Sequence, residues 1–393
     1  MPLKYIDQID LKQKRVFVRV DFNVALDKKT GAITDDTRIR ACLPTIQYAL
    51  ENNARVVLAS HLGRPKGEVI PHLSLLAVGE RLSDLLKRPV LFPEDCVGDG
   101  VRKLASDMND GDVMLLENLR FHKEETDNNP QFAASLAALG EVYINDAFGT
   151  CHRAHASTAG MVSHFQEKGA GFLIQKELNF LNKLMTKPER PFVAILGGAK
   201  VSDKIGVIEN LLTKVDAIAI GGGMAYTFLA AQGIAIGKSL FEEEKVHLAK
   251  KILDRAVSRG VAIHLPVDHI ASSSLEGKAE TTPGVDIADD RIGLDIGPKT
   301  LENFSRVIRG AKTIFWNGPL GLFENAVFAR GTLEIAKVIA KSRAVSVAGG
   351  GDSLAAIKKA GVADKIGHLS TGGGATLEFL EGKKLPGLVA LEI

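Results

Sequence analysis

Short apolar runs alternate with helical patterns along most of this chain of 393 residues, and this alternation restricts the folds that it can adopt. In the first half, apolar runs at 15–20, 55–60, 113–116 and 142–144 each lead into polar residues. Helical patterns lie between them, for example at 38–50 and 74–86. Strands that alternate with helices favour a parallel, doubly wound sheet, in which ligands bind beyond the carboxyl ends of the strands.

The second half repeats the alternation, but its apolar runs end in glycine. The runs at 192–196, 218–220, 313–316 and 344–348 lead into Gly197-Gly198, Gly221–Gly223, Asn317-Gly318-Pro319 and Gly349–Gly351. An amphipathic segment at 171–185 separates the halves and predicts a rigid connecting helix whose ends act as hinges. We therefore predict an α/β protein with two doubly wound, Rossmann-like domains, at 1–170 and 188–373, joined by a helix at 171–187.

Length and charge agree with two domains and exclude several partners. The chain is too long for one typical core, and its net charge of +2 gives no global attraction to nucleic acid or a membrane. Residues 1–15 lack the apolar region of a signal peptide, so we expect a cytoplasmic protein. The uncharged run at 217–237 is long enough for a membrane span, but three glycines interrupt it, and we predict a strand at 217–220 and a buried helix at 224–231.

The three cysteines, Cys42, Cys96 and Cys151, are odd in number and far apart, without the spacing of metal ligands. This usage indicates a reducing compartment and free, buried thiols. His152 and His155, three residues apart, resemble a pair of metal ligands, but no third ligand has suitable spacing nearby. We expect these two histidines to form hydrogen bonds instead.

Charged side chains gather at the strand ends of the first domain. Asp21, Asn23, His61, Arg64 and Arg120 share one edge of the predicted sheet, and Arg38 and Arg153 lie on segments that can join it. Arginine binds carboxylate and phosphate through two parallel hydrogen bonds, while Asp and Asn hold hydroxyls. A small phosphorylated hydroxy acid fits this set, although any one strand-end arginine can be a solvated structural residue.

The corresponding edge of the second domain suits a nucleotide. The stretch 192–205 reads as a strand, a glycine turn and a helix start, which places Lys200 and Lys204 on one helix face above backbone amides that can approach a phosphate. A solvated pair of lysines is the alternative. Asp352 follows a glycine turn and suits either a magnesium ion that bridges phosphates or the N-cap of a helix.

Two common nucleotide motifs are absent. The segment 233–239 has three residues between its glycines, where a Walker A loop requires four. No G-x-G-x-x-G fingerprint follows a predicted strand, which argues against a nicotinamide-dependent dehydrogenase. A non-catalytic nucleotide sensor remains open, but it would not need an arginine pocket on a second domain.

Ten ordered sequence blocks resemble the phosphoglycerate kinase family over nearly the whole chain. They are R-V-D-F-N-V at 19–24, S-H-L-G-R-P at 60–65, E-N-L-R-F at 117–121, N-D-A-F-G-T at 145–150, H-R-A-H at 152–155, G-G-A-K-V-S-D-K at 197–204, W-N-G-P at 316–319, F-E at 323–324, G-G-G-D-S at 349–353 and S-T-G-G-G-A at 370–375. The departures are small: Ala25 stands where proline is common, and Cys151, beside His152 and Arg153, stands where alanine is usual. A lowered pKa would make Cys151 sensitive to oxidation, but we expect an inert buried thiol.

The resemblance implies reversible transfer of a phosphoryl group from 1,3-bisphosphoglycerate to MgADP, giving 3-phosphoglycerate and MgATP, by a monomeric glycolytic enzyme. It implies that Asp21, Asn23, Arg38, His61, Arg64, Arg120 and Arg153 hold phosphoglycerate, with Arg38 nearest the reacting carboxyl group. It implies a nucleotide site of Lys200, Lys204, Gly221, Gly222, Gly293, Asn317, Glu324, Gly350, Gly351, Asp352 and Ser353, with Asp352 on Mg²⁺. It also implies that residues 374–393 return to the first domain.

This chemistry needs no covalent intermediate, because a carboxylate or an acyl phosphate already reacts without a general base. Arg38, Lys204 and Lys200 are then the expected catalytic groups, which stabilise charge in the transition state. We also expect the domains to close, so that the two ligands meet and water is excluded.

Overall fold

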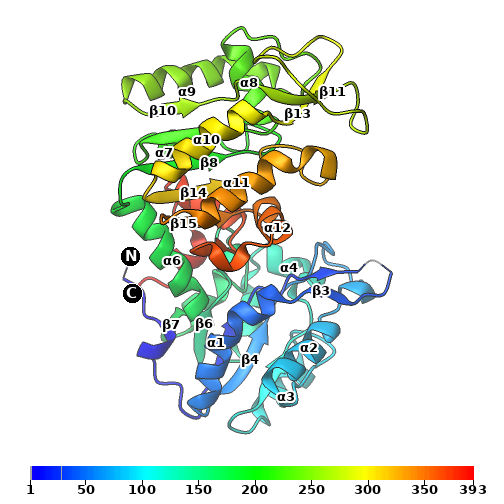
Figure 1. Cartoon of the computed structure of the whole chain (residues 1–393). Coiled ribbons are helices and arrows are strands. Elements are labelled where there is room, and N and C mark those ends of the chain that lie inside the picture. Colours follow the sequence, from blue (N-terminus) through cyan, green and yellow to red (C-terminus); the bar gives the residue numbers. More distant parts are fainter. Residues whose placement is uncertain (1, 28) are drawn as a thin grey trace. The chain divides into compact units, whose positions relative to one another are not determined.

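Each half of the chain is built on its own parallel β-sheet, as Figure 1 shows for the computed structural model, which describes residues 2–27 and 29–393. By their contacts the residues divide into two units. Unit 1 comprises Met1–Asn179 and Lys384–Ile393, and unit 2 comprises Phe180–Lys383. The predicted α/β class with two doubly wound parallel sheets is confirmed. The domain boundaries at 170/171, 187/188 and 373/374 stay predictions.

The sheet of unit 1 has the strand order β5-β4-β1-β6-β7, and all neighbouring strands are parallel. Its strands are β1 (Arg15–Arg19), β4 (Arg55–Ala59), β5 (Val113–Leu115), β6 (Val142–Asn145) and β7 (Glu167–Ala170). The chain builds the sheet outward from β1, first to one side and then to the other, so the order reverses between β1 and β6. Such a reversal opens a crevice at the carboxyl ends of the central strands.

The sequence analysis found four of these five strands. It missed β7, because this edge strand carries Glu167 and Lys168 and therefore lacks the apolar run of a buried strand. It also missed the antiparallel pair β2 (Ala25–Leu26) and β3 (Ile33–Asp35), which is too short to show a pattern.

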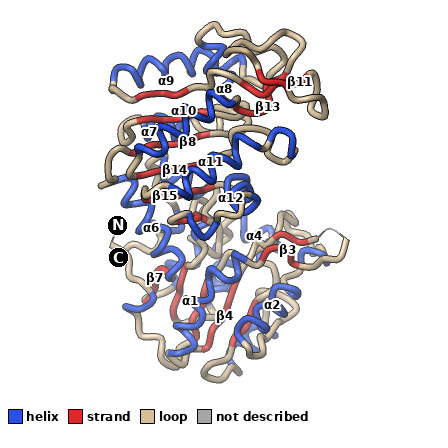
Figure 2. Tube along the Cα trace, in the orientation of Figure 1, coloured by secondary structure: helices blue, strands red, loops and turns tan. Residues whose placement is uncertain are grey.

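Helices cover the sheet of unit 1, as the blue and red segments of Figure 2 show. They are α1 (Thr37–Glu51), α2 (Leu76–Leu86), α3 (Asp99–Ser106), α4 (Lys123–Thr126), α5 (Pro130–Ala137) and α14 (Pro386–Val389), with single 3₁₀ turns at Ile6–Gln8, Pro71–Leu73, Leu119–Phe121, Phe148–Thr150 and Gly160–His164. Helix α1 buries Ile39, Cys42 and Ile46, which are spaced three and four residues apart, against Val18 of β1 and Leu58 of β4 within one core. This packing fixes the first turn of α1 relative to the end of β1.

The long helix α6 (Phe172–Thr186), which the sequence predicts at 171–185, begins at a buried carboxylate. Oδ1 of Asp146, one residue beyond β6, accepts hydrogen bonds from the backbone N–H groups of Leu173 (2.9 Å) and Ile174 (3.3 Å). These are first-turn donors that have no partner inside the helix. Burial raises the pKa of Asp146 to about 7, and these hydrogen bonds oppose the rise only in part.

The sheet of unit 2 has the order β10-β9-β8-β14-β15-β16, again entirely parallel. Its strands are β8 (Phe192–Leu196), β9 (Ala217–Ile220), β10 (Ala262–His264), β14 (Thr313–Asn317), β15 (Val345–Gly349) and β16 (His368–Ser370). A small antiparallel sheet of β11 (His269–Ser272), β12 (Glu280–Thr281) and β13 (Ile292–Ile296) lies in the chain between β10 and β14. Here the order reverses between β8 and β14, so the second crevice lies at the ends of these strands.

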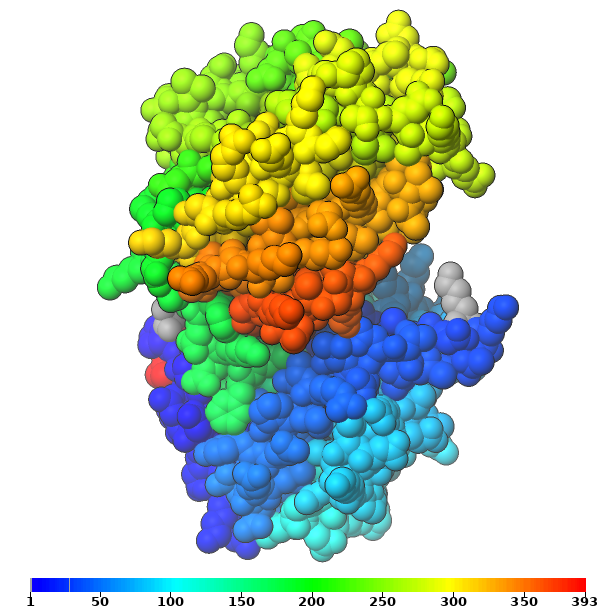
Figure 3. All heavy atoms as spheres, in the orientation of Figure 1, coloured from blue at the N-terminus to red at the C-terminus, as the bar shows by residue number. Residues whose placement is uncertain are grey.

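The helices of unit 2 are α7 (Ile205–Leu211), α8 (Met224–Ala231), α9 (Val246–Ser258), α10 (Pro298–Gly310), α11 (Arg330–Lys341), α12 (Gly351–Lys359) and α13 (Gly374–Leu380), with 3₁₀ turns at Glu243–Lys245, Ala326–Phe328 and Ala363–Lys365. Helices α10 and α11 lie side by side, as the adjoining yellow and orange bands of Figure 3 show. The strand at 217–220 and the helix at 224–231 form as predicted. Among the described residues, no helix is both long and apolar enough to cross a membrane.

One local prediction is wrong. Helix α7 begins at Ile205, so Lys200 and Lys204 do not lie on one helix face. Residues between the glycine turn and α7 form a loop, in which Ser202 donates hydrogen bonds to the Glu242 carboxylate from its backbone N–H (2.9 Å) and its hydroxyl (2.6 Å). This bonding gives the backbone of the loop an alternative to helix formation.

Candidate active site

The end of β1 in unit 1 carries a largely buried group of polar and charged side chains. Arg38, in the first turn of α1, donates through Nη1 to Oδ2 of Asp21. Burial opposes ionisation of Asp21, but the positive charges around it, led by Arg38, lower its pKa below the usual value. Asp21 is therefore a carboxylate at neutral pH that holds Arg38 in place at the rim of the sheet.

His61 and Arg19 complete this group. His61 Nδ1 lies 4.0 Å from Oδ1 of Asp21 and 3.3 Å from Nη2 of Arg19. Burial lowers the pKa of His61 well below its ordinary value, and Asp21 offsets this effect only partly. His61 is therefore neutral at physiological pH and acts as a hydrogen-bonding group without charge.

Asn23 and Arg120 fix the loop that follows β4. Oδ1 of Asn23 accepts from the backbone N–H of Gly63 (2.9 Å), and Nη1 of Arg120 donates to the carbonyl oxygen of the same Gly63 (2.8 Å). Burial, together with the charges of Arg19 and Arg153, lowers the pKa of Arg120 to about 10. Nε of Arg120 is buried without a hydrogen-bond partner. A buried cation with an unused donor is suited to an anionic ligand.

Three of the predicted arginines share one pocket of about 280 Å³. Its lining consists of Arg64, Lys66, Gly67, Arg120, Lys123, Thr126 and Arg153. Five of these seven residues carry cationic side chains, and none is acidic. The structure thus brings Arg64, Arg120 and Arg153 together as the sequence analysis predicts, and it adds two lysines.

Of the two histidines expected to form hydrogen bonds, His152 does so through its ring, whereas Nδ1 of His155 is buried without a hydrogen-bond partner. Nε2 of His152 accepts a hydrogen bond from Nε of Arg153 (3.1 Å), and Nδ1 of His155 lies 3.8 Å from Oε1 of Glu125. Burial and the nearby arginines lower the pKa of His155 to about 3. His155 therefore adds no positive charge to the cationic pocket.

The second pocket, in unit 2, is mainly apolar and holds about 290 Å³. Its lining comprises Gly198, Ala199, Gly222, Gly223, Tyr226, Leu240, Leu275, Ile292, Gly293, Leu294, Pro319, Leu320, Gly321, Leu322, Glu324 and Asp352. Four predicted nucleotide residues, Gly222, Gly293, Glu324 and Asp352, are among them. A mainly apolar pocket whose lining includes glycines and two carboxylates suits a nucleoside, because its ring can pack on apolar groups and its hydroxyls can bind polar groups.

Glycine at 222 is required by close packing of backbones. Its φ is +68°, and a side chain there would place Cβ 2.8 Å from the backbone N of Gly198 and from the carbonyl oxygen of Pro319. The turns after β8, β9 and β14 therefore meet through their main chains. Gly221 does not line the pocket, and its Cα faces Leu320 instead.

Lys204 points toward the end of β14. Its Nζ donates to Oδ1 of Asn317, and Nδ2 of Asn317 donates to the carbonyl oxygen of Gly349 (2.7 Å). Burial lowers the pKa of Lys204, while Asp203 and Asp352 oppose this effect. Asn317 thus orients a half-buried lysine and does not itself line the pocket.

Asp352 and Ser353 occupy the first turn of α12, in which Gly351 is the first residue. The N-cap of this helix is Gly350, so the alternative in which Asp352 serves as N-cap is wrong. Asp352 is exposed at the pocket, whereas Ser353 is buried and its Oγ accepts from the backbone N–H of Gly318 (2.6 Å). Lys200 is exposed and lies outside the pocket lining.

Sequence reasoning missed Arg19, whose guanidinium group contacts His61 in the group at the end of β1. Its side chain is fully buried, and it donates to Ser157 Oγ (2.8 Å), whose hydroxyl in turn donates to Glu125 (2.6 Å). One signal was present: an arginine inside an apolar strand has to be paired, because a buried charge without a partner is very costly. For Lys66, Lys123, Tyr226, Leu240 and Leu275, the sequence offers no comparable signal.

The chain is similar to known proteins over nearly its whole length. The family model described as "Phosphoglycerate kinase" matches residues 6–383. A phosphoglycerate kinase of Anaeromyxobacter dehalogenans is 57% identical over 396 residues, with all of both chains covered, and one of Clostridium botulinum is 54% identical over 392 residues, covering 99% of this chain and 98% of the relative. The solved structure of phosphoglycerate kinase from Coxiella burnetii superposes with a TM-score of 0.89 at 41% identity and 99% coverage of each chain. Because a family model and relatives of this identity span nearly the full length, the chain belongs to the phosphoglycerate kinase family.

Proposed function

We propose that the cationic pocket of unit 1 binds the phosphoglycerate and that the glycine-lined pocket of unit 2 binds the nucleotide in the reaction of this family. As a family member the chain is a glycolytic kinase that transfers a phosphoryl group reversibly between 1,3-bisphosphoglycerate and ADP. The observation that carries the assignment is the contrast between the two pockets, one with five cationic side chains and one apolar with two carboxylates.

On the phosphoglycerate side, we assign the distal phosphate to Arg64, Arg120 and Arg153. Arginine forks match phosphate oxygens, and the orphan Nε of Arg120 offers a donor that no protein group uses. Asp21 and Asn23 are suited to the hydroxyl group. Arg38 and neutral His61 are then left for the carboxyl end, where the reaction takes place.

On the nucleotide side, the pocket around Gly222 and Gly293 takes the nucleoside, and Glu324 takes a ribose hydroxyl. Lys204, Lys200 and the first turn of α12, with Gly350, Gly351 and Ser353, take the phosphates, because helix N-termini and lysines favour anions. Asp352 fits Mg²⁺, since this ion commonly binds one or two carboxylates together with substrate phosphates. Mg²⁺ supplies charge neutralisation on the nucleotide phosphates.

Catalysis then consists of positioning and charge stabilisation. The carboxylate of 3-phosphoglycerate attacks the γ-phosphorus of ATP directly, so no side chain has to remove a proton. Arg38 stabilises the charge that develops at the carboxyl end, and Lys204 and Lys200 stabilise the phosphoryl oxygens. Before the ligand binds, the side chain of Lys204 is held by its hydrogen bond to Asn317. The side chain of Lys200 is exposed, so the bound ligand has to order it.

Transfer requires both ligands in one water-free site, so we propose that the units close around them. Small-angle scattering tests this step without measuring activity. The radius of gyration should fall when 3-phosphoglycerate and MgATP are added together, and each ligand alone serves as the control. An unchanged radius with both ligands would refute closure.

The direct test of function is a coupled assay of ATP formation from 1,3-bisphosphoglycerate and MgADP. The expected result is turnover that stops when Mg²⁺ is chelated. Nicotinamide turnover with the same substrate, followed by absorbance, would instead favour a dehydrogenase. We further propose a cytoplasmic monomer without nucleic-acid or membrane partners, and light scattering after gel filtration checks the mass against 42.1 kDa.

A further inference from the structure

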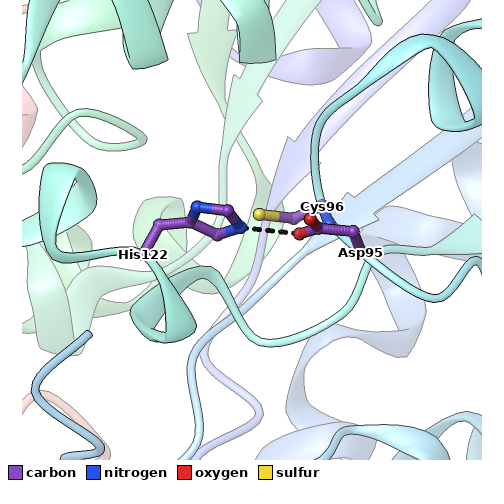
Figure 4. A group of neighbouring side chains, drawn as sticks. All are labelled: Asp95, Cys96 and His122. Carbon is purple, nitrogen blue, oxygen red and sulfur yellow. Dashed lines mark hydrogen bonds and ion pairs between the residues drawn. The ribbon is translucent and has the colours of Figure 1, made fainter. Parts of the chain in front are cut away.

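Outside both pockets, unit 1 holds three side chains with metal-ligating atoms that face one another. Asp95 and Cys96 lie in the loop before α3, and His122 lies between the 3₁₀ turn Leu119–Phe121 and α4. One ligand atom from each residue lies within 4.8 Å of the other two, the one group of three found among residues 2–27 and 29–393. Figure 4 shows the imidazole, the sulfur and the carboxylate directed toward a common point.

Hydrogen bonds and ring packing hold the three side chains in place. Oδ1 of Asp95 lies 2.7 Å from Nε2 of His122 and accepts from the backbone N–H of Cys96 at 2.6 Å. The ring of Phe132 packs against the His122 imidazole, with centroids 5.2 Å apart, and this contact restricts the ring orientation. A preordered set of ligands loses less conformational entropy when it binds an ion.

We propose that Asp95, Cys96 and His122 form a Zn²⁺ site that is distinct from the magnesium–nucleotide site. The donor set is one sulfur, one nitrogen and one oxygen, which suits zinc and not the oxygen-seeking Mg²⁺. Three protein ligands leave one position of a tetrahedral ion for water. Access is open on one side, because the side chain of Asp95 is 49% exposed and that of His122 is 29% exposed.

The required rearrangement is small. Around tetrahedral zinc, oxygen and nitrogen ligands stand about 3.4 Å apart and sulfur and nitrogen about 3.5 Å apart. The distance between Oδ1 of Asp95 and Nε2 of His122 therefore increases by about 0.7 Å, and the sulfur of Cys96 moves closer to the other two ligand atoms by at most about 1.3 Å. These shifts require side-chain rotations in two loops and leave the sheet unchanged.

The proton balance of binding follows from the same residues. The sulfur of Cys96 is fully buried, and this burial, together with the charges of Asp95 and Glu125, raises the pKa of its thiol well above the ordinary value. Zn²⁺ replaces the thiol proton, which is released to the buffer. The positive charge of the ion then stabilises the buried thiolate, which apolar surroundings alone would disfavour. At His122 the ring nitrogen that faces Asp95 is Nε2, so the metal binds the tautomer in which Nε2 presents its lone pair and the proton lies on Nδ1.

Cobalt provides a test that reads the sulfur ligand directly. Titration of the chelator-treated full chain with Co²⁺ should give a near-ultraviolet thiolate-to-cobalt charge-transfer band that saturates at one ion per chain and disappears when Zn²⁺ is added. Cobalt at Asp352 gives no such band, because no sulfur lies there. Cys96→Ser should abolish the band, whereas Cys42→Ser, which changes a buried thiol outside the group, should retain it.

A second variant covers the case in which Cys96→Ser does not fold. His122→Gln should weaken Zn²⁺ binding about tenfold or more in competition with a coloured chelator, since loss of a ligand costs at least as much as loss of a supporting partner. At a fixed Zn²⁺ concentration it should also give a smaller rise in melting temperature than the unaltered chain shows, because the stabilisation falls as Kd increases. Absence of the band in the unaltered chain, its survival in Cys96→Ser, or equal zinc affinity in His122→Gln would overturn the proposal.

Discussion

The Arg38→Ala substitution gives the sharpest test of the proposed phosphoglycerate site. Arg38 is paired with Asp21 at the end of β1, so the structure assigns it a fixed position at the rim of the unit 1 sheet. The substitution removes one positive charge without touching the pocket of unit 2. We therefore expect a fall in kcat together with an unchanged Kd for MgADP.

The size of the effect follows from Coulomb's law. A unit charge about 4 Å from the transferring group contributes about 4 kcal/mol at an effective dielectric constant near 20. The side chain of Arg38 is 33% exposed, so water screens part of this interaction and about 3 kcal/mol remains. Since each 1.36 kcal/mol corresponds to a factor of ten, kcat should fall about a hundredfold.

Arg40→Ala is the matched control. Arg40 lies on the same helix and also pairs with an aspartate, with Nε 2.9 Å from Oδ1 of Asp36, but it is 53% exposed. Such a surface ion pair contributes little, and we expect kcat within about twofold of the unaltered enzyme. The assay is ATP formation at saturating substrates, with MgADP affinity measured by calorimetry. A kcat within tenfold of normal for Arg38→Ala, or an equal loss for Arg40→Ala, would refute the assignment.

Three further predictions concern other parts of the fold. Gly293→Ala should weaken MgADP binding about tenfold or more, because its Cβ would collide with the Tyr226 hydroxyl in the proposed nucleotide pocket. Gly310→Ala, where a Cβ meets open space, is the control, and both affinities are measured by calorimetry. Equal MgADP affinities in the two variants would contradict the prediction. The buried carboxyl of Asp146 binds its proton up to about pH 7 in the folded state but only to about pH 3.8 when unfolded, so it should remove about 4 kcal/mol of stability as pH rises from 4 to 7. The free energy of unfolding, measured with urea between pH 4 and 7, should decline less for Asp146→Asn than for the unaltered chain. An unchanged dependence of this free energy on pH would exclude Asp146 as the cause. All three cysteines are buried and free, so a thiol reagent should label them only after unfolding. Fast labelling of Cys151 in the native enzyme would contradict the prediction that its thiol is unreactive.

The sequence alone determined the class of fold and the edge of each sheet at which the candidate site residues lie. Apolar runs at β1, β4, β8 and β14 are long enough to identify buried parallel strands, and the residues that follow a parallel strand must lie at its carboxyl end. Asp21, His61, Arg64 and Gly222 could therefore be placed before any coordinates. The strands β7 and β16 could not, because short or charged edge strands lack an apolar pattern.

Only the tertiary structure decided which distant side chains meet and which local signals are overridden. Lys200 and Lys204 have helical spacing, yet they do not lie on a common helix face, because residues 199–204 form a loop before α7. In this loop Ser202 donates hydrogen bonds to Glu242, which lies 40 residues away in the sequence. Likewise, Cys96 and His122 have no metal-binding spacing, and their proximity arises where two loops of unit 1 converge. Local patterns fix strands and turns because these depend on neighbours in sequence, whereas contacts between loops depend on how whole elements pack.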